Sequence, residues 1–304
     1  MSGSPSHHNV FLYGEDGALV DQVVRFLTRG IAEREAVVIV LDPRKTALVR
    51  EALGAIAARV ASVERDTLFT RPEDALAGYD ALVRRYLQDG APRVRVFGEL
   101  PLCRTKTDSD AWILYEALLN PAFAHHRVTI ACGLDGREQP DEVIEGSWRT
   151  HPRTLNNDWS DNGHFHDPSD TVRALTPRPD DVSGLMAIPA DEGARALRRR
   201  LRSEMAAWQM PDDRAHKMLT ATGEILANAH RHGGGVRRVR AGRVGEQFVC
   251  EISDHGPGLD DPLAGYLPPH PGHGGGAGLW VARQATRRLE MISTGRGLTT
   301  RLWA

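Results

Sequence analysis

Cysteine is scarce in this chain of 304 residues, and its three cysteines, Cys103, Cys132 and Cys250, lie far apart. No C-x-x-C pair occurs, which argues against both a disulfide framework and a zinc site. A chain with so few cysteines is suited to a reducing compartment, so we expect a cytoplasmic protein.

Long hydrophobic runs are also missing. A run such as "AVVIVL" at 36–41 is far too short to span a bilayer, and the first ten residues contain no apolar core of a signal peptide. The formal net charge of -2 gives no reason to expect a nucleic-acid or membrane partner. Hydrophobic residues make up 41% and charged residues 26%, which is typical of a soluble globular protein, and the length predicts about two domains.

The first half alternates short apolar runs with amphipathic stretches, which predicts a three-layer α/β fold with a mostly parallel sheet. No G-x-x-x-x-G-K-[ST] motif is present, so this half shows no P-loop. The predicted strands are 9–14, 36–41, 59–64, 93–98 and 127–132. A first helix is predicted from the spacing of Val20, Val23, Val24 and Leu27 and ends at Gly30, and further helices are predicted near 44–58, 72–90 and 108–120.

The stretch after residue 152 is rich in Pro, Asp, Asn and Ser and has no apolar periodicity, which predicts a linker over 153–183. It contains His164, His166 and Asp167, with His151 just before it. These side chains could form a metal site, but a polar linker is the simpler interpretation because no helical spacing fixes their geometry.

The second half, 184–304, mixes predicted helices with predicted antiparallel strands and is therefore an α+β unit. Strands are predicted at 184–190, 236–244 and 247–254, followed by two more at the C-terminal end. Helices are predicted at 191–208, 212–232 and 278–288.

One of these helices carries an unusual polar stripe in "TGEILANAHRHGGG" (222–235). Glu224, Asn228 and His232 recur every fourth residue and therefore share one helix face. An amide oxygen such as that of Asn228 suits Mg²⁺, and Glu224 is placed to accept a proton from an attacking hydroxyl or water. A solvated helix face is the ordinary alternative for such residues, and His232 has no clear chemical step.

Two further segments point to nucleotide chemistry. In "SDHGPG" (253–258) a strand ends at Asp254, whose carboxylate could accept a hydrogen bond from an adenine amine, and Gly256 and Gly258 allow close backbone approach. In "GGGAGLW" (274–280) Gly276 and Gly278 precede a helix whose N-terminus could bind phosphate. Each segment is common by itself, but the ordered set of three is much more specific.

Together the three segments resemble the N, G1 and G2 boxes of the GHKL (Bergerat-fold) ATPases, over about residues 184–304. The resemblance implies an ATP and Mg²⁺ site in which Glu224 is the general base, Asn228 the Mg²⁺ ligand and Asp254 the adenine-binding residue. It also implies ATP-binding roles for Gly256, Gly258, Gly276, Gly278 and Thr299.

Within that superfamily, "LRSEMAAWQMPDD" (201–213) resembles the anti-sigma factor serine kinases, in which a helix ending in Trp and a Pro-Asp turn precede the Glu/Asn helix. A sensor histidine kinase would need a two-helix hairpin with a phosphoacceptor His upstream, and 171–200 is too short and lacks His. The predicted lid, 259–275, is rich in Pro, Gly and His, which departs from the family pattern and makes turnover an open question.

The first half, over 7–152, resembles the DcmR-type sensory domain called MEDS, a relative of RecA-like folds. The matching pieces are "HHNVFLYGEDGALVDQVVRFLTRGI" (7–31), "VRVFGEL" (94–100), "LYEALLN" (114–120), "VTIACGLDG" (128–136) and "WRTHP" (148–152). The resemblance implies sensing of an unknown small-molecule signal. Glu99 and Glu116 are candidate site residues, because they could face each other at the carboxyl ends of strands. Surface or loop contacts are the alternative for both, and Cys132 is expected to be a buried small hydrophobe.

The sequence therefore predicts a signalling regulator in which a sensory domain controls an ATP-binding kinase domain of the anti-sigma factor type. The expected partners are a sigma factor or an anti-sigma antagonist, and the expected state is a homodimer. A nucleotide- or ligand-responsive binding switch without phosphoryl transfer is the alternative, and a sensor histidine kinase is a weaker one.

Overall fold

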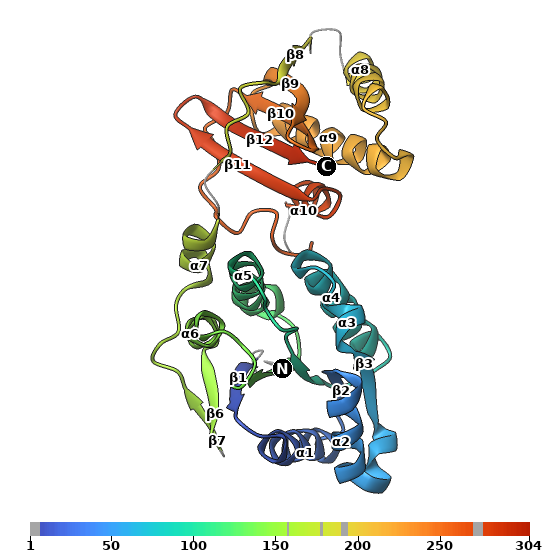
Figure 1. The fold of residues 1–304 in the computed structure, drawn as a ribbon, viewed down its shortest axis with the longest axis vertical. Coiled ribbons are helices and arrows are strands. Elements are labelled where there is room, and N and C mark those ends of the chain that lie inside the picture. Colours follow the sequence, from blue (N-terminus) through green and yellow to red (C-terminus); the bar gives the residue numbers. More distant parts are fainter. Residues whose placement is uncertain (1–6, 157, 177–178, 190–193, 270–275) are drawn as a thin grey trace. The chain divides into compact units, whose positions relative to one another are not determined.

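A computed structural model describes residues 7–156, 158–176, 179–189, 194–269 and 276–304. The chain divides into two compact units, 1–175 and 176–304. Each unit has its own sheet and its own core, and most of their elements are labelled in Figure 1.

The first unit is an α/β unit built on a seven-stranded sheet of order β3-β2-β4-β5-β1-β6-β7. All neighbouring strands run parallel except the last pair, β6 and β7. Its strands are β1 (His7–Tyr13), β2 (Ala36–Leu41), β3 (Val60–Glu64), β4 (Val94–Glu99), β5 (Val128–Asp135), β6 (Arg153–Asn156) and β7 (Asp158–Asp161). Its helices are α1 (Asp16–Ala32), α2 (Pro43–Leu53), η1 (Gly54–Arg59), α3 (Arg65–Leu68), α4 (Pro72–Gln88), α5 (Lys106–Phe123), α6 (Asp141–Thr150) and α7 (Pro168–Leu175).

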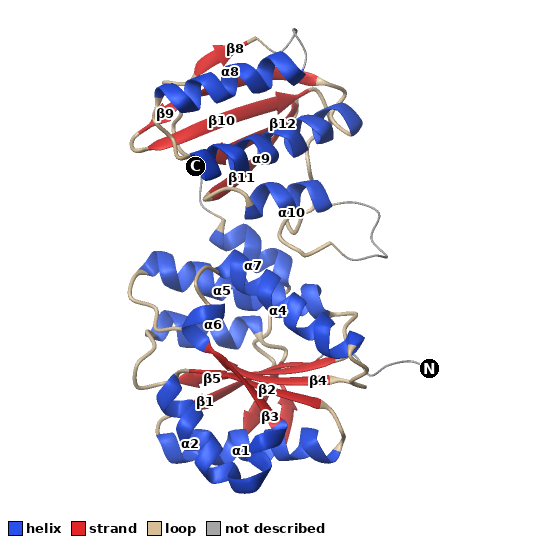
Figure 2. Cartoon of the chain, turned by 90° about the vertical axis from the view of Figure 1, so that its right-hand side faces the viewer, coloured by secondary structure: helices blue, strands red, loops and turns tan. Residues whose placement is uncertain are grey.

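Helices cover both faces of this sheet, so its central strands are buried on both sides. Figure 2 shows α1 and α2 on one face and α4, α5 and α6 on the other. All residues of β4 and β5 are buried, as expected for parallel strands between two helical layers. On α1, the apolar residues Leu19, Val23, Phe26 and Leu27 recur at helical spacing and pack into the core.

Local sequence signals explain where two of these helices begin. Asp42 accepts a hydrogen bond from the Lys45 backbone N–H at 2.8 Å, and Pro43 occupies the first turn of α2. Thr105 and Asp108 form a reciprocal capping box at the start of α5. The structure also describes β6, β7 and α7 within the segment where the sequence predicts a linker.

The second unit is an α+β unit with an antiparallel five-stranded sheet of order β11-β12-β10-β9-β8. Its helices α8, α9 and α10 cover one face of the sheet (Figure 2). The strands are β8 (Met186–Ile188), β9 (Val236–Val244), β10 (Gln247–Asp254), β11 (Arg288–Thr294) and β12 (Gly297–Trp303). The helices are α8 (Ala194–Ala207), α9 (Asp212–Arg231) and α10 (Ala277–Gln284).

Strand β10 shows how the two faces of this sheet differ. Phe248, Cys250 and Ile252 point toward the helices and belong to the main core of the unit. Val249 alternates with them and packs with Val182, Leu185 and Trp303 in a smaller cluster.

The fold class predicted from the sequence is confirmed for both halves, because a mostly parallel α/β sheet precedes an antiparallel α+β unit. Among the described residues, no helix has the length and the hydropathy needed to cross a membrane.

Candidate functional site

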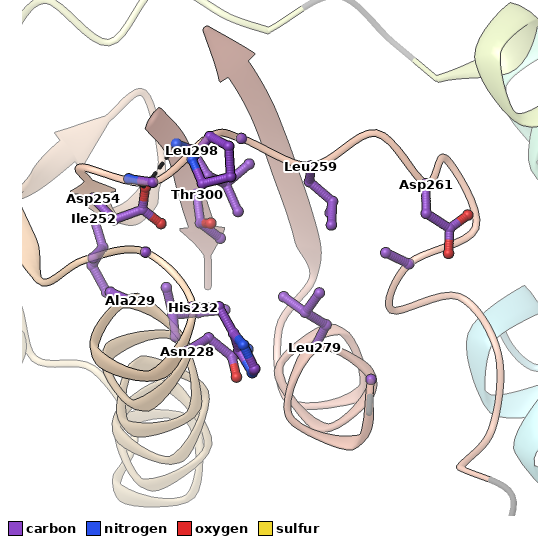
Figure 3. Close-up of a pocket in the computed structure, with 17 residues that line it drawn as sticks. Asn228, Ala229, His232, Ile252, Asp254, Leu259, Asp261, Leu279, Leu298 and Thr300 are labelled. Atoms are coloured by element: carbon purple, nitrogen blue, oxygen red, sulfur yellow. Dashed lines mark hydrogen bonds between the residues drawn. The ribbon is translucent and has the colours of Figure 1, made fainter. Parts of the chain in front are cut away.

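A cavity of about 330 Å³ lies in the second unit, between α9, β10, the loop that follows β10, α10 and β12. In Figure 3, Asn228 and His232 come from the C-terminal end of α9, and Leu279 comes from α10. The lining residues are Ile225, Asn228, Ala229, His232, Gly233, Ile252, Asp254, Gly256, Pro257, Gly258, Leu259, Asp261, Ala264, Gly276, Leu279, Leu298 and Thr300.

Asp254, the last residue of β10, lines this cavity and is 8% exposed. Its Oδ1 accepts a hydrogen bond from the backbone N–H group of Gly256 at 3.0 Å. It accepts a second one from the backbone N–H group of Leu298 at 2.8 Å (Figure 3). These two bonds hold Oδ1 and thereby fix the orientation of the carboxylate. No described residue donates a hydrogen bond to Oδ2, so that oxygen remains available to a ligand.

Three glycines let the backbone pass close to this carboxylate. A Cβ on Gly233 would lie 2.5 Å from Asp254 Cγ, and one on Gly297 would lie 2.2 Å from the Asp254 carbonyl oxygen. Gly256 is equally confined, because its Cβ would lie 2.8 Å from Gly233 Cα. Side chains at these positions would displace Asp254, so the glycines preserve its position.

The polar stripe predicted on α9 faces the first turn of α10. A Cβ on Gly278 would lie 2.8 Å from Glu224 Oε2 and 3.3 Å from Asn228 Nδ2. Asn228 and His232 line the cavity, whereas Glu224 lies at this edge of it and is not among the lining residues. The helix spacing therefore brings the stripe to one side of the cavity.

The N-terminus of α10 completes this side. Gly276 precedes the helix in the left-handed conformation, with φ of 91°, and lines the cavity. The first intrahelical bond runs from Trp280 N to Gly276 O at 3.0 Å. The N–H groups of the three residues between them have no intrahelical acceptor, which makes this helix end suitable for binding an anion.

Thr299, the predicted late threonine, does not line the cavity. Thr299 Oγ1 lies 2.9 Å from Ser253 Oγ, and the cavity is lined by its neighbour Thr300 instead. Successive side chains of β12 point to opposite faces of the sheet, so the predicted ATP-binding role of Thr299 has no support in this geometry. Gly258 lines the cavity with φ of 95°, and residues 270–275 of the predicted lid lie outside the described residues.

In the first unit, the two predicted glutamates belong to separate clusters rather than facing each other. Glu99, at the end of β4, accepts hydrogen bonds from Lys45 Nζ at 2.8 and 2.9 Å and from the Tyr13 hydroxyl. Lys45 Nζ also donates to Asp135 at 3.3 Å. Burial raises the pKa of Glu99, although the hydrogen bonds from Lys45 and Tyr13 oppose that change.

Glu116, on α5, contacts residues of three other elements. Its Oε2 lies 3.0 Å from His8 Nε2, 3.2 Å from His151 Nε2 and 3.5 Å from Cys132 Sγ. Burial, together with the proximity of His151, lowers the pKa of His8 to about 4. Burial raises the pKa of the Cys132 thiol well above its usual value, and the charge of Glu116 adds to that shift.

The sequence does not predict the contacts of several residues in these sites. The backbone N–H of Leu298 and the close approach of Gly233 and Gly297 cannot be read from a motif. Cys132 was expected only as a buried small hydrophobe and His151 only as a residue next to a polar linker. Both contact Glu116 because β5 and the end of α6 meet α5, which the sequence does not indicate.

Comparison with known families gives a separate match for each of the two units. Residues 7–152 match the family model of MEDS, the methanogen/methylotroph, DcmR sensory domain, and residues 188–303 match that of the histidine kinase-like ATPase domain. The chain joins a MEDS domain to a histidine kinase-like ATPase domain. Both resemblances drawn from the sequence are confirmed at this level.

The comparison with curated proteins found no match. The pairing of a sensory domain with a kinase-like ATPase domain indicates a signalling regulator, and an ATPase domain of this family implies that the second unit binds ATP.

Proposed function

We propose that the histidine kinase-like ATPase domain binds ATP with Mg²⁺ and transfers the γ-phosphoryl group to a serine or threonine of a partner protein. The MEDS domain regulates this activity in response to a small-molecule signal. The partner class that fits best is an anti-sigma antagonist or a sigma factor, and the active form is a homodimer.

The geometry of Asp254 is the observation that carries the proposal. Its Oδ1 is held by two backbone N–H groups, while Oδ2 is left for a donor in the cavity. The exocyclic amine of adenine is such a donor. The apolar side chains of Ile225, Ile252 and Leu279 line the same cavity and supply surfaces suited to a flat ring.

The opposite side of the cavity suits the phosphates. The first N–H groups of α10 can bind phosphate oxygens, since the helix begins at the lining residue Gly276. Mg²⁺ bound to Asn228 would neutralise charge on the phosphates. Glu224 stands one turn away on α9, next to Gly278, and is assigned to accept the proton of the attacking hydroxyl.

The segment before α9 supports a kinase of the anti-sigma factor type over a histidine kinase. Helix α8 ends at Ala207, Trp208 packs against Phe248, and the Pro-Asp turn starts α9. In the described part of 171–200, α7 ends at Leu175 and α8 begins at Ala194, which leaves little room for the upstream two-helix hairpin of a histidine kinase.

The test is to incubate the full chain with ATP labelled at the γ-phosphate and an anti-sigma antagonist protein, then to analyse the labelled amino acid. We expect acid-stable label on serine or threonine of the antagonist. Acid-labile label on this chain would instead indicate histidine phosphorylation and contradict the proposal. ATP binding without any transfer would favour the alternative, a binding switch that uses the nucleotide only as a ligand.

A further inference from the structure

Four buried side chains in the MEDS domain converge on one point that the proposed kinase function does not use. His8 lies on β1, Glu116 on α5, Cys132 on β5, and His151 caps the C-terminus of α6. One ligand atom from each lies within 4.8 Å of the others, and all four residues are buried. We propose that these residues form a closed four-ligand site for a divalent transition-metal ion, Zn²⁺ being the ion that fits best.

Four of the six distances between the ligand atoms are close to those of a tetrahedral site. Ligand atoms about 2.0–2.3 Å from a central ion in tetrahedral geometry lie roughly 3.3–3.7 Å from one another. The observed separations are 3.0 Å for His8 Nε2 to Glu116 Oε2 and 3.4 Å for Cys132 Sγ to His8 Nε2. Those from Glu116 Oε2 to His151 Nε2 and Cys132 Sγ are 3.2 and 3.5 Å. These four separations lie within about 0.3 Å of the tetrahedral range, and the two remaining ones are at most 4.8 Å, so the ligand atoms of His151, His8 and Cys132 need to move together by about 1 Å or less.

Hydrogen bonds on the far side of each imidazole orient the rings. His151 Nδ1 lies 2.8 Å from the Ser147 carbonyl oxygen, which can only accept a hydrogen bond. His8 Nδ1 lies 3.2 Å from Asn120 Oδ1, and the amide nitrogen of Asn120 donates to the Thr150 carbonyl at 2.8 Å. Both Nδ1 atoms therefore carry hydrogen, so in a neutral ring the Nε2 atom, which faces the carboxylate, offers its lone pair to a metal ion. This is the arrangement of metal-binding histidines.

Without a cation, the cluster is poorly satisfied. If both rings are neutral with hydrogen on Nδ1, two imidazole lone pairs and a carboxylate oxygen meet in a buried space, and the Cys132 thiol supplies the one hydrogen among these four atoms. His151 Nε2 is buried and has no hydrogen-bond partner among the described residues, even though it lies 3.2 Å from Glu116 Oε2. A cation at the centre would satisfy all four atoms together.

Charge balance and donor type favour zinc. Coordination replaces the thiol proton of Cys132, which leaves for solvent, by a bond from the thiolate sulfur to the metal. The thiolate and the Glu116 carboxylate together carry a charge of about -2, so a divalent ion makes the buried site neutral. Imidazole, thiolate and carboxylate are all ordinary zinc ligands. The lack of paired cysteines argued against zinc in the sequence, but this site needs only one cysteine.

All four positions are filled by the protein, which is typical of a structural site rather than a catalytic one. The ion would tie β1, β5, α5 and the end of α6 together. Because the ligands are buried, we expect the ion to be acquired as the domain folds.

The test uses the full chain without an affinity tag, produced in cobalt-supplemented medium. Co²⁺ is a spectroscopic substitute for Zn²⁺. We expect about one ion per chain, intense visible bands of four-coordinate Co²⁺ and a near-ultraviolet thiolate-to-cobalt band. Wild-type protein that lacks stoichiometric metal or the thiolate band would overturn the proposal. That result would mean that the cluster only shares a proton between Glu116 and the histidines.

Two cysteine variants localise the ion. Cys132→Ser should lose the thiolate band, whereas Cys103→Ser, a buried cysteine elsewhere in the same domain, should keep it. Retention of the band in Cys132→Ser would contradict the site. Asn120→Ala leaves all four ligands in place but removes the hydrogen-bond partner of His8, so we expect metal affinity to fall about 10- to 100-fold. Circular dichroism of each variant verifies that it has folded.

Discussion

At the residue scale, the roles proposed for Asp254 and Glu224 differ, because Asp254 is held at the cavity by backbone N–H groups and Glu224 is not among the residues that line it. Loss of Glu224 should therefore affect chemistry more than binding. For Glu224→Gln we expect phosphoryl transfer to fall by at least ~100-fold. ATP affinity, measured by calorimetry, should change by less than about threefold.

The matched control for that prediction is Glu246→Gln, which removes a carboxylate that is 88% exposed in the turn after β9. It should transfer phosphate at the wild-type rate. A Glu224→Gln variant that remains as active as this control would exclude Glu224 as the base.

Gly278, which lies next to the Glu224 carboxylate, provides a second test of the role proposed for Glu224. Its φ is not in the left-handed region, so Gly278→Ala is tolerated by the backbone, but the new Cβ would lie 2.8 Å from Glu224 Oε2. We expect Glu224 to shift and turnover to fall more than ATP affinity. Gly223→Ala is the control, because its Cβ would meet nothing within 4 Å and should stabilise α9 by about 0.5–1 kcal/mol. Equal activity of the two variants would argue against a catalytic position for Glu224.

His8 predicts a pH dependence of stability in chelator-treated protein. Burial lowers its folded pKa to about 4, below the ordinary histidine value of about 6.5. Between these two values the unfolded chain binds more protons, so stability should decrease as pH falls from about 6.5 to 4, by at most about 3 kcal/mol. Urea denaturation at a series of pH values measures the slope, which should be smaller in His8→Gln. An identical slope in that variant would assign the effect to other groups.

The sequence indicates site residues whose partners are close in the chain, and it does not indicate those whose partners are distant in the chain. Glu224 and Asn228 are four residues apart on one helix, so helix geometry alone predicts their shared face. The cluster around Glu116 joins His8 to Cys132 across more than a hundred residues, and no local spacing encodes that contact. Thr299 was carried over by resemblance, and the alternation of side chains along β12 turns it away from the cavity.

At the element scale, the bounds of an element were predicted correctly where a local sequence signal, such as a turn glycine, marks its end. The hairpin of β9 and β10 has the predicted bounds, because Gly245, with φ of 58°, starts a two-residue turn between them. Helix α10 ends at Gln284 instead of reaching the predicted 288, since Arg288 pairs with Trp303 at the start of β11. That pairing is tertiary and outweighs the helical pattern. Helix α6 was not predicted, although it lies within residues 7–152, which match the MEDS family model.

The outer face of the second sheet depends on one buried carboxylate. Glu251 on β10 is 1% exposed and pairs with Arg240 of β9 and Arg301 of β12, at 2.8 and 3.0 Å. Because Glu251→Ala removes the charged acceptor that Arg240 and Arg301 share, and leaves Arg301 paired with Glu290, it should destabilise this unit by about 1.5–3 kcal/mol. Denaturant unfolding measures it. The exposed pair of Arg243 and Glu246 is the comparison, and Glu246→Ala should cost less than about 1 kcal/mol. Similar costs for both would contradict the role given to Glu251.

At the scale of the whole molecule, the second unit needs residues that precede its family match. Val182 and Leu185 pack on Val249 and Trp303, although the match begins at residue 188. A fragment of 176–304 should fold and bind ATP, whereas 188–304 should lose about 3 kcal/mol or more of stability because it exposes that cluster. Thermal unfolding of both fragments measures the difference. Equal stability would mean that 176–187 is dispensable.

Regulation of one unit by the other requires that the signal affect two states of the ATPase domain differently. If the MEDS domain restrains or activates the kinase, the full chain and fragment 176–304 should differ in transfer rate while their ATP affinities remain similar.

Calorimetric titration of ATP–Mg²⁺ into the full chain and into Asp254→Ala tests the central claim most directly. The wild-type chain should bind about one ATP, and the variant should bind at least ~10-fold more weakly, because it lacks the carboxylate proposed to accept the adenine amine. No measurable binding by the wild-type chain, or equal affinity in Asp254→Ala, would contradict the assignment of this cavity as the nucleotide site.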